Sequence, residues 1–240
     1  GIIPFAHGGQ AWQDATVFEA VAMGIGGNNY YKNCYVDLKE TCLRSETTVK
    51  VFDQMRKLQG FTDEGSPGRD WNVATGMVIE GKAGFQIMGD WAKGEFTAAG
   101  KVPGVDYYCA ATPSNNGYLY NVDSFIFYKT SDPDKQEGQK LLAKLMMGKN
   151  FQKVFNLYKG SIPARLDVPM DEFDKCAKTS NSDIKTAGAS GGLVPSFAHG
   201  MAQGNTMKAA LQDVITEHFN SDMSSVDAAN ALADSVLDNM

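Results

Sequence analysis

The stretch that most constrains this chain is residues 84–96, where a short apolar run meets a signal for the start of a helix. Residues 85–88 predict a buried strand that ends at a glycine. Asp90 is expected to cap the helix that follows, with its carboxylate on the first free amides. Trp91 would then lie at the carboxyl end of a strand, where open α/β sheets bind their ligands. The indole can serve as a flat apolar platform with one N–H donor, or as a core anchor.

The first half of the chain alternates between strand and helix patterns. Residues 1–6 predict a strand, and a helix from Trp12 is expected to stop at the glycine cluster 24–29. Residues 30–44 suggest a polar, tyrosine-rich loop. A helix with apolar residues at period 3.6 is expected between Ser45 and Gly60. Further helices are predicted from Trp71, from Ser131, from Asn150 and between Ser225 and Leu237. Helices outnumber strands, and their alternation predicts an α/β fold.

Two later segments have strand character. Residues 106–111 form a short strand-like run. Residues 118–128 are rich in aromatic and β-branched side chains, which makes them the strongest strand pattern in the sequence. Asp123 falls inside this second run. A carboxylate in such a run needs a partner or must face a cleft, so Asp123 is a candidate functional residue.

Charge and hydropathy exclude several classes of function. The formal net charge of -6 over 240 residues argues against a nucleic-acid partner, which would require a concentrated basic face. No apolar run approaches the roughly 20 residues of a membrane span. No signal-peptide pattern precedes the first predicted strand, so we expect the sequence to be a processed or truncated piece of a longer one.

Four cysteines occur, at positions 34, 42, 109 and 176. They form no C-x-x-C pair and have no histidine nearby in the sequence, so they predict no metal site. Cys34 and Cys42 flank a short polar segment and could form a disulfide. Four free, buried thiols are the alternative that the cysteines by themselves leave open.

Four side chains with binding chemistry stand next to glycines or strands: Trp91, Asp123, Lys159 and His199. They do not form a catalytic triad, and no G-x-S-x-G or H-E-x-x-H motif is present. They do suit a carbohydrate, which has apolar C–H faces and a ring of hydroxyl groups. An indole covers such a face, while carboxylate, ammonium and imidazole groups accept and donate hydrogen bonds.

Two other functions remain open on these residues. Asp123 and Asp90 could be the paired carboxylates of a glycosidase, although the sequence does not give their separation. The chain could also be an interaction module without a small ligand.

Several motifs resemble the extracellular solute-binding proteins of ABC sugar importers, and the glucose-binding members in particular. The resemblance covers essentially the whole chain. The segments that carry it are AHGGQAWQ (6–13), GRDWN (68–72), GKAGFQIMGDW (81–91), YNVDSF (120–125), KGSIPAR (159–165) and PSFAHGM (195–201).

The resemblance implies a helix-rich α/β fold of the type II periplasmic-binding-protein kind, without enzymatic activity or a cofactor. It implies a periplasmic or extracellular location, a monosaccharide ligand (glucose first) held in an interlobe cleft, and an ABC transporter membrane permease as partner. In the family, the residues that match Trp91, Asp123, Lys159 and His199 contact the pyranose. Trp71 and Arg69 match a family motif as well and are carried over as further candidates.

The resemblance also implies a division into lobes. Residues 1–108 and 160–240 correspond to the C-terminal lobe. Residues 109–159 correspond to the hinge crossing and to a segment of the N-terminal lobe, whose front part is missing here. That missing N-terminal segment is an expected partner. With export implied, we expect disulfides between Cys109 and Cys176 and between Cys34 and Cys42.

Overall fold

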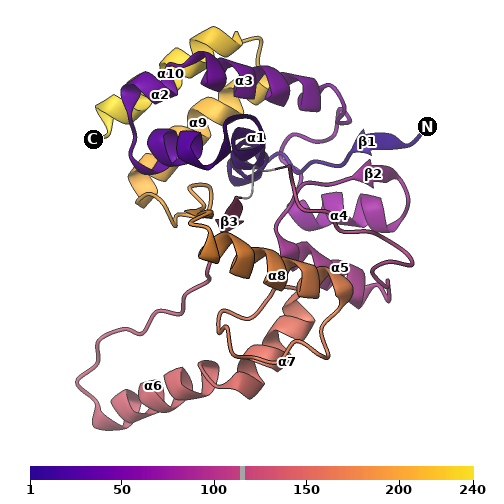
Figure 1. Ribbon diagram of the computed structural model, residues 1–240, viewed down its shortest axis with the longest axis vertical. Coiled ribbons are helices and arrows are strands. Elements are labelled where there is room, and N and C mark those ends of the chain that lie inside the picture. The colour runs from indigo at the N-terminus through magenta and orange to yellow at the C-terminus, as the bar shows by residue number, and fades with distance from the viewer. Residues whose placement is uncertain (114–116) are drawn as a thin grey trace. The chain divides into compact units, whose positions relative to one another are not determined.

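The computed structural model of the chain describes residues 1–113 and 117–240 and is rich in helices joined by short strands (Figure 1). The chain divides into two compact units. Unit 1 contains residues 1–89, 110–121 and 182–240, and unit 2 contains residues 90–109 and 122–181. The assignment of residues 1–108 and 160–240 to one lobe remains a prediction, because grouping by compactness does not identify lobes.

Unit 1 combines helices with two pairs of short parallel strands. Its helical elements are α1 (Ala11–Tyr31), the π-helical turn η1 (Lys32–Val36), α2 (Glu40–Leu43), α3 (Glu46–Gln59), α4 (Trp71–Ile79), α9 (Asn205–Asn220) and α10 (Ser225–Asp238). Strand β1 (Ile3–Phe5) pairs with β2 (Ala83–Phe85), and β3 (Tyr118–Tyr120) pairs with β4 (Leu193–Pro195). The registers place Ile3 opposite Ala83 and Tyr118 opposite Leu193.

The main core of unit 1 lies among α1, α3, α9 and α10 (Figure 1). Phe18, Phe52, Leu211 and Leu232 each come from a different one of these helices, and all four are fully buried. The rings of Phe18 and Phe52 lie 5.0 Å apart. The predicted helix between Ser45 and Gly60 is confirmed, since the period of 3.6 turns one apolar face into this core.

Unit 2 contains the 3₁₀ turn η2 (Asp90–Ala92), α5 (Lys93–Ala98), α6 (Pro133–Met146) and α7 (Lys149–Lys159). Helix α8 (Lys175–Ala189) begins in unit 2 and ends in unit 1. The predicted start of α6 is confirmed: Asp132 accepts hydrogen bonds from the amides of residues 134 and 135, and Pro133 occupies the first turn. Lys93 forms an ion pair with Asp174 at 2.7 Å.

The glycine cluster 24–29 does not stop the first helix, contrary to the sequence prediction. Only Gly27, with a φ of 72°, leaves the helical region, and α1 continues beyond this kink to Tyr31. Helical glycine costs about 1 kcal/mol relative to alanine, a cost that burial of the Tyr31 ring can offset. The predicted loop 30–44 is also wrong, because it contains η1 and α2.

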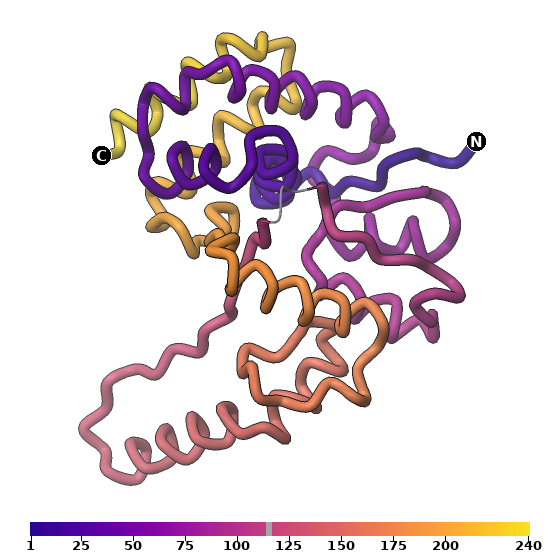
Figure 2. Tube along the Cα trace, viewed as in Figure 1, coloured from indigo at the N-terminus to yellow at the C-terminus, as the bar shows by residue number. Residues whose placement is uncertain are grey.

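The strands are shorter than the sequence predicts, and one predicted strand is not formed. Strand β2 ends at Phe85, which is 75% exposed, so residues 85–88 are not the expected buried strand. Residues 106–111 form no strand, and the nearest pairing is an isolated bridge between Pro103 and Tyr107. Of residues 118–128 only β3 is a strand. Among the described residues no strand pairs with the extended segment that follows β3 (Figure 2). A strand needs a neighbouring strand for its backbone hydrogen bonds, and residue type alone does not supply one.

Both expected disulfides are present, Cys34–Cys42 and Cys109–Cys176. The first links η1 to α2 within unit 1, and the second lies within unit 2. The alternative of four free thiols is therefore wrong.

Candidate functional site

Asp123 and Lys159, which are 36 residues apart in the sequence, meet in unit 2 as an ion pair. Lys159 is the last residue of α7, and Asp123 lies in the extended segment after β3. The Asp123 side chain is 58% exposed and the Lys159 side chain 27%, so solvent reaches both charges. The Lys159 ammonium also lies 5.9 Å from the centre of the Phe155 ring. Acceptor, donor and aromatic ring are thus brought to one place.

A close approach between two glycines fixes the end of α7. Gly160 has a φ of 91° and ends the helix in the left-handed conformation. A Cβ on Gly94 of α5 would lie 2.8 Å from the Lys159 carbonyl oxygen, and one on Gly160 would lie 2.6 Å from the Gly94 nitrogen. The backbone of α5 therefore sets the position from which the Lys159 side chain extends.

Trp91 lies in the 3₁₀ turn η2 and is partly exposed. Its neighbour Asp90 does not cap the next helix as predicted. The Asp90 carboxylate instead accepts a hydrogen bond from the amide of Ile162 at 3.2 Å, which fastens η2 to the segment after α7. Burial raises the pKa of Asp90, while hydrogen bonding to Ser161 and the charge of Lys93 act in the opposite direction.

In unit 1, His199 follows strand β4 and packs against α1. Its Nδ1 lies 2.8 Å from Ser196 Oγ, and that hydroxyl donates to Glu19 at 2.7 Å. The edge of the Trp12 indole lies against the imidazole, with ring centres 6.0 Å apart. The indole N–H of Trp12 donates to Gln10 at 2.9 Å. Unit 1 therefore holds an imidazole and an indole within a polar network.

Arg69 and Trp71 also belong to unit 1, at the start of α4. The Arg69 guanidinium makes two hydrogen bonds to Asp63 and a third to the carbonyl of His7. The hydrogen bonds from Arg69 lower the pKa of Asp63. Arg69 is thus engaged in holding a loop, which leaves it less capacity for a ligand. Trp71 begins α4 and is partly exposed.

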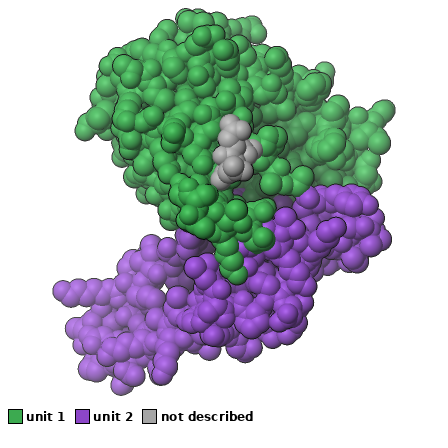
Figure 3. All heavy atoms as spheres, in the orientation of Figure 1, with its two compact units in different colours: residues 1–89, 110–121, 182–240 green, residues 90–109, 122–181 purple. Residues whose placement is uncertain are grey.

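The six candidates divide evenly between the units shown in Figure 3. Unit 2 carries Trp91, Asp123 and Lys159, and unit 1 carries His199, Trp71 and Arg69. Three residues of the site were not predicted from the sequence: Glu19, Ser196 and Trp12. The last two fall inside segments that carry the resemblance, but Glu19 has no distinguishing pattern around it in the sequence.

The described residues hold no helix that is long and apolar enough to cross a membrane, and no group of acidic, histidine or cysteine side chains that could hold a metal ion.

Comparison with known proteins identifies the family to which the chain belongs. Residues 5–213 match the family described as "Bacterial extracellular solute-binding protein", and the chain belongs to this family. The predicted resemblance and the helix-rich α/β fold are confirmed. The family consists of binding proteins rather than enzymes, and its extracellular location agrees with the predicted export.

The chain is also similar to individual proteins whose descriptions name a sugar. The chain is 47% identical over 237 residues to a "Probable sugar-binding periplasmic protein" of Brucella suis biovar 1 (strain 1330), covering 98% of this chain and 56% of the relative. It is 45% identical over 237 residues to a protein of the same description in Rhizobium meliloti (strain 1021), covering 98% and 57%. It thus spans little more than half of these relatives. A solved "Chitin oligosaccharide binding protein" has the same fold at a TM-score of 0.75 and 16% identity, with 99% of this chain and 60% of that chain covered.

Proposed function

We propose that the chain forms part of a periplasmic-type binding protein that captures a monosaccharide, glucose first, and delivers it to the membrane permease of an ABC importer. The observation that carries the proposal is the solvent-accessible pair of Asp123 and Lys159 beside the Phe155 ring. A carboxylate and an ammonium in contact offer an acceptor and a donor to neighbouring hydroxyl groups of one sugar. The descriptions of the relatives in Brucella and Rhizobium support the same class of ligand.

We assign Trp91 the role of an apolar platform and His199 that of a further hydrogen-bonding contact, in line with the family motifs that they match. Trp71 and Arg69 remain secondary candidates. The three hydrogen bonds that Arg69 makes within unit 1 favour a supporting role for it. No cofactor is needed for binding alone.

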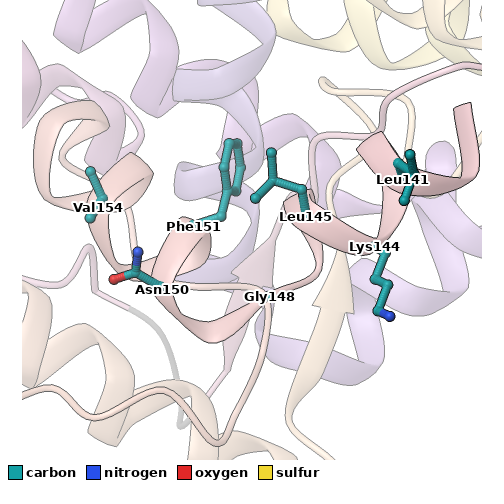
Figure 4. Close-up of a pocket in the computed structure, with 7 residues that line it drawn as sticks. All are labelled: Leu141, Lys144, Leu145, Gly148, Asn150, Phe151 and Val154. Carbon is teal, nitrogen blue, oxygen red and sulfur yellow. The ribbon is translucent and has the colours of Figure 1, made fainter. Parts of the chain in front are cut away.

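The remaining partner that we propose is an N-terminal segment, since the relatives carry further chain beyond the region that matches. Unit 2 exposes an apolar surface, made by α6, α7 and the extended segment before α6, which such a segment would cover. Its exposed members are Phe125, Ile126, Tyr128, Leu141, Leu142, Leu145, Val154, Phe155 and Tyr158. The residues that line an open hollow of about 520 Å³ on this surface include Leu145 and Phe151 (Figure 4).

Two features of this surface favour a covering segment made of chain rather than a small ligand. The extended segment has strand character but no strand partner among the described residues, so its backbone can pair with an added strand. Exposed apolar patches of this kind mark interaction sites in soluble proteins. The curated relatives have the length to supply such a segment.

One observation favours a second function. Burial raises the pKa of Asp90, which is what a general acid of a glycosidase requires, and Asp123 would then be the second carboxylate. Against this, Asp90 is held by Ile162 and Asp123 is paired with Lys159.

The experiment uses the chain joined to the part of the Brucella suis relative that the match leaves uncovered. Calorimetry of this joined protein with glucose, galactose and mannose, combined with an assay for hydrolysis of glycosides, decides between these functions. Binding without turnover supports the transport protein. Turnover that is lost in Asp123→Asn while sugar binding is retained supports the glycosidase. If no sugar releases heat or raises the melting temperature of this joined protein, the chain is an interaction module.

A further inference from the structure

Glu19 is a buried carboxylate in the middle of α1, and three groups of unit 1 donate hydrogen bonds to it. Ser196 Oγ donates to one oxygen at 2.7 Å. The Tyr31 hydroxyl and the amide of Ala198 donate to the other oxygen, at 3.0 and 3.3 Å. Burial, and then the charge of Glu19, raise the pKa of Tyr31 well above its usual range, so the phenol keeps its proton. A buried carboxylate is costly unless donors surround it, and here they do.

The single proton of Ser196 decides what His199 can do. Ser196 Oγ lies between two groups, the Glu19 oxygen at 2.7 Å and His199 Nδ1 at 2.8 Å. A carboxylate can only accept, so the hydroxyl proton goes to Glu19. Ser196 Oγ must then accept from His199, and Nδ1 must carry a proton. The backbone amide of His199 also donates to Ser196 Oγ, at 3.1 Å.

We propose that Glu19 is a positioning residue: it acts through Ser196 to hold the imidazole of His199 in the Nδ1–H tautomer. The second ring nitrogen, Nε2, is then an acceptor, and it takes a hydrogen bond from a ligand hydroxyl. The edge of Trp12 against the ring restricts the orientation of the imidazole. The ligand part of this proposal rests on the proposed function, whereas the tautomer does not.

Glu19→Gln is a nearly isosteric change, and it should switch His199 to the other tautomer. The backbone amide of Ala198 can only donate, so the amide oxygen of the glutamine must face Ala198 and Tyr31. The amide nitrogen then faces Ser196 and donates to its hydroxyl oxygen. Ser196 turns its own proton toward His199 Nδ1, and the imidazole proton moves to Nε2. In the variant, His199 Nε2 is therefore a hydrogen-bond donor, whereas in the parent chain it is the acceptor that we assign to a ligand hydroxyl.

Nitrogen-15 NMR of the 240-residue chain, labelled at histidine, measures this directly. The chain has only three histidines, and comparison with His199→Asn assigns the signals of His199. At neutral pH the parent chain should show a protonated Nδ1 and an unprotonated Nε2. Glu19→Gln should reverse the two, whereas the exposed control Glu217→Gln should leave them unchanged. Ser196→Ala removes the relay and should give a mixture of tautomers. The proposal is overturned by an Nε2–H tautomer in the parent chain, or by an unchanged tautomer in folded Glu19→Gln.

Sugar titration tests the ligand part of the proposal, and it uses the chain joined to the part of the Brucella suis relative that the match leaves uncovered. Glu19→Gln should weaken glucose binding about tenfold, since one hydrogen bond changes direction, and Glu217→Gln should not weaken it. If Glu19→Gln cannot be obtained folded, the proposal is still tested by the tautomers of the parent chain and of Ser196→Ala. An Nε2–H tautomer in the parent chain would overturn it. If the tautomers are as stated but no sugar binds to any variant, the proposed function fails and the role of Glu19 as a positioning residue stands.

Discussion

At the scale of single residues, the pair of Asp123 and Lys159 is the feature with the most direct consequence for binding. Lys159→Met keeps an unbranched side chain of nearly the same length and removes its charge. Because hydrogen bonds to charged groups contribute about 1.5–3 kcal/mol, sugar affinity should fall roughly tenfold to a hundredfold. Isothermal titration of the variant measures this loss.

Lys135→Met is the matched control, since Lys135 forms an exposed ion pair with Asp132 in the same unit. It should leave the affinity unchanged. An equal loss in both variants would show that general charge, rather than the Asp123 pair, holds the ligand.

His218 gives a residue-scale prediction about stability and pH. The ring is buried against Phe52, and within the described residues neither ring nitrogen has a hydrogen-bond partner. Burial, and then the charge of Arg56, lower its pKa from 6.5 to about 4, while Asp53 acts in the opposite direction. The unfolded chain therefore binds this proton first, and stability should fall as the pH drops from about 6.5 to about 4.

His218→Leu removes this titration. Its urea midpoint should change less between pH 7 and pH 4.5 than that of the parent chain. At pH 7 the variant should be about as stable or more stable by ~1 kcal/mol, because a buried polar group without partners is lost. A parallel loss of stability in the two proteins over this pH range would contradict the assignment.

At the scale of elements, the crossing of α5 and α7 at Gly94 and Gly160 holds Lys159 in place. Gly94→Ala should destabilise unit 2 by about 2 kcal/mol, because its methyl group would meet the Lys159 carbonyl oxygen. It should also weaken sugar binding by shifting the end of α7. Denaturant unfolding and calorimetry measure the two effects.

Gly138→Ala in α6 is the control. Among the described residues no atom lies within 4 Å of the place that the added methyl group would take. This change should therefore stabilise the helix by up to about 1 kcal/mol and leave binding intact. If Gly94→Ala behaves like Gly138→Ala, the close crossing does not exist.

Helices were predictable from the sequence to the extent that they carry their own signals. Ser45 and Asp132 cap α3 and α6 as expected, because capping is a local interaction. Strands were not predictable in the same way, since their hydrogen bonds depend on a partner. Residues 118–128 have the strongest strand pattern in the chain, yet β4 supplies a pairing partner for β3 alone.

The candidate site was partly predictable for a similar reason. Residue type and motif indicated Asp123 and Lys159, but a separation of 36 residues gives no sign that they touch. Glu19 could not be found, because a glutamate within a helix looks like any surface residue until its burial is known.

At the scale of the whole molecule, the two disulfides predict how the chain responds to reduction. Cys109–Cys176 closes a loop with a sequence separation of 67, and Cys34–Cys42 one of 8. By loop-closure entropy, the first disulfide stabilises the folded chain by about 4 kcal/mol, and the second by less. Mass spectrometry after non-reducing digestion should recover both linked peptides, and reduction should lower the melting temperature. Four thiols that react with an alkylating agent in the native protein would contradict both bridges.

The exposed apolar surface of unit 2 and the N-terminal segment that we propose as its partner lead to one prediction about affinity. The 240-residue chain alone should bind glucose in the millimolar range or not at all, because charged contacts left open to water are weakened. Adding in trans the part of the Brucella suis relative that the match leaves uncovered should restore some affinity. Micromolar binding by the isolated chain would show that unit 1 and unit 2 already contain all the contacts that the sugar needs.

The most direct test of the account is calorimetric titration of glucose, galactose and mannose into the chain joined to that uncovered part of the Brucella suis relative. The account predicts one-to-one binding, tightest for glucose, that is weakened by Lys159→Met and unaffected by Lys135→Met, with no sugar consumed. A folded protein that binds none of the three sugars, or one that hydrolyses a glycoside, would contradict it.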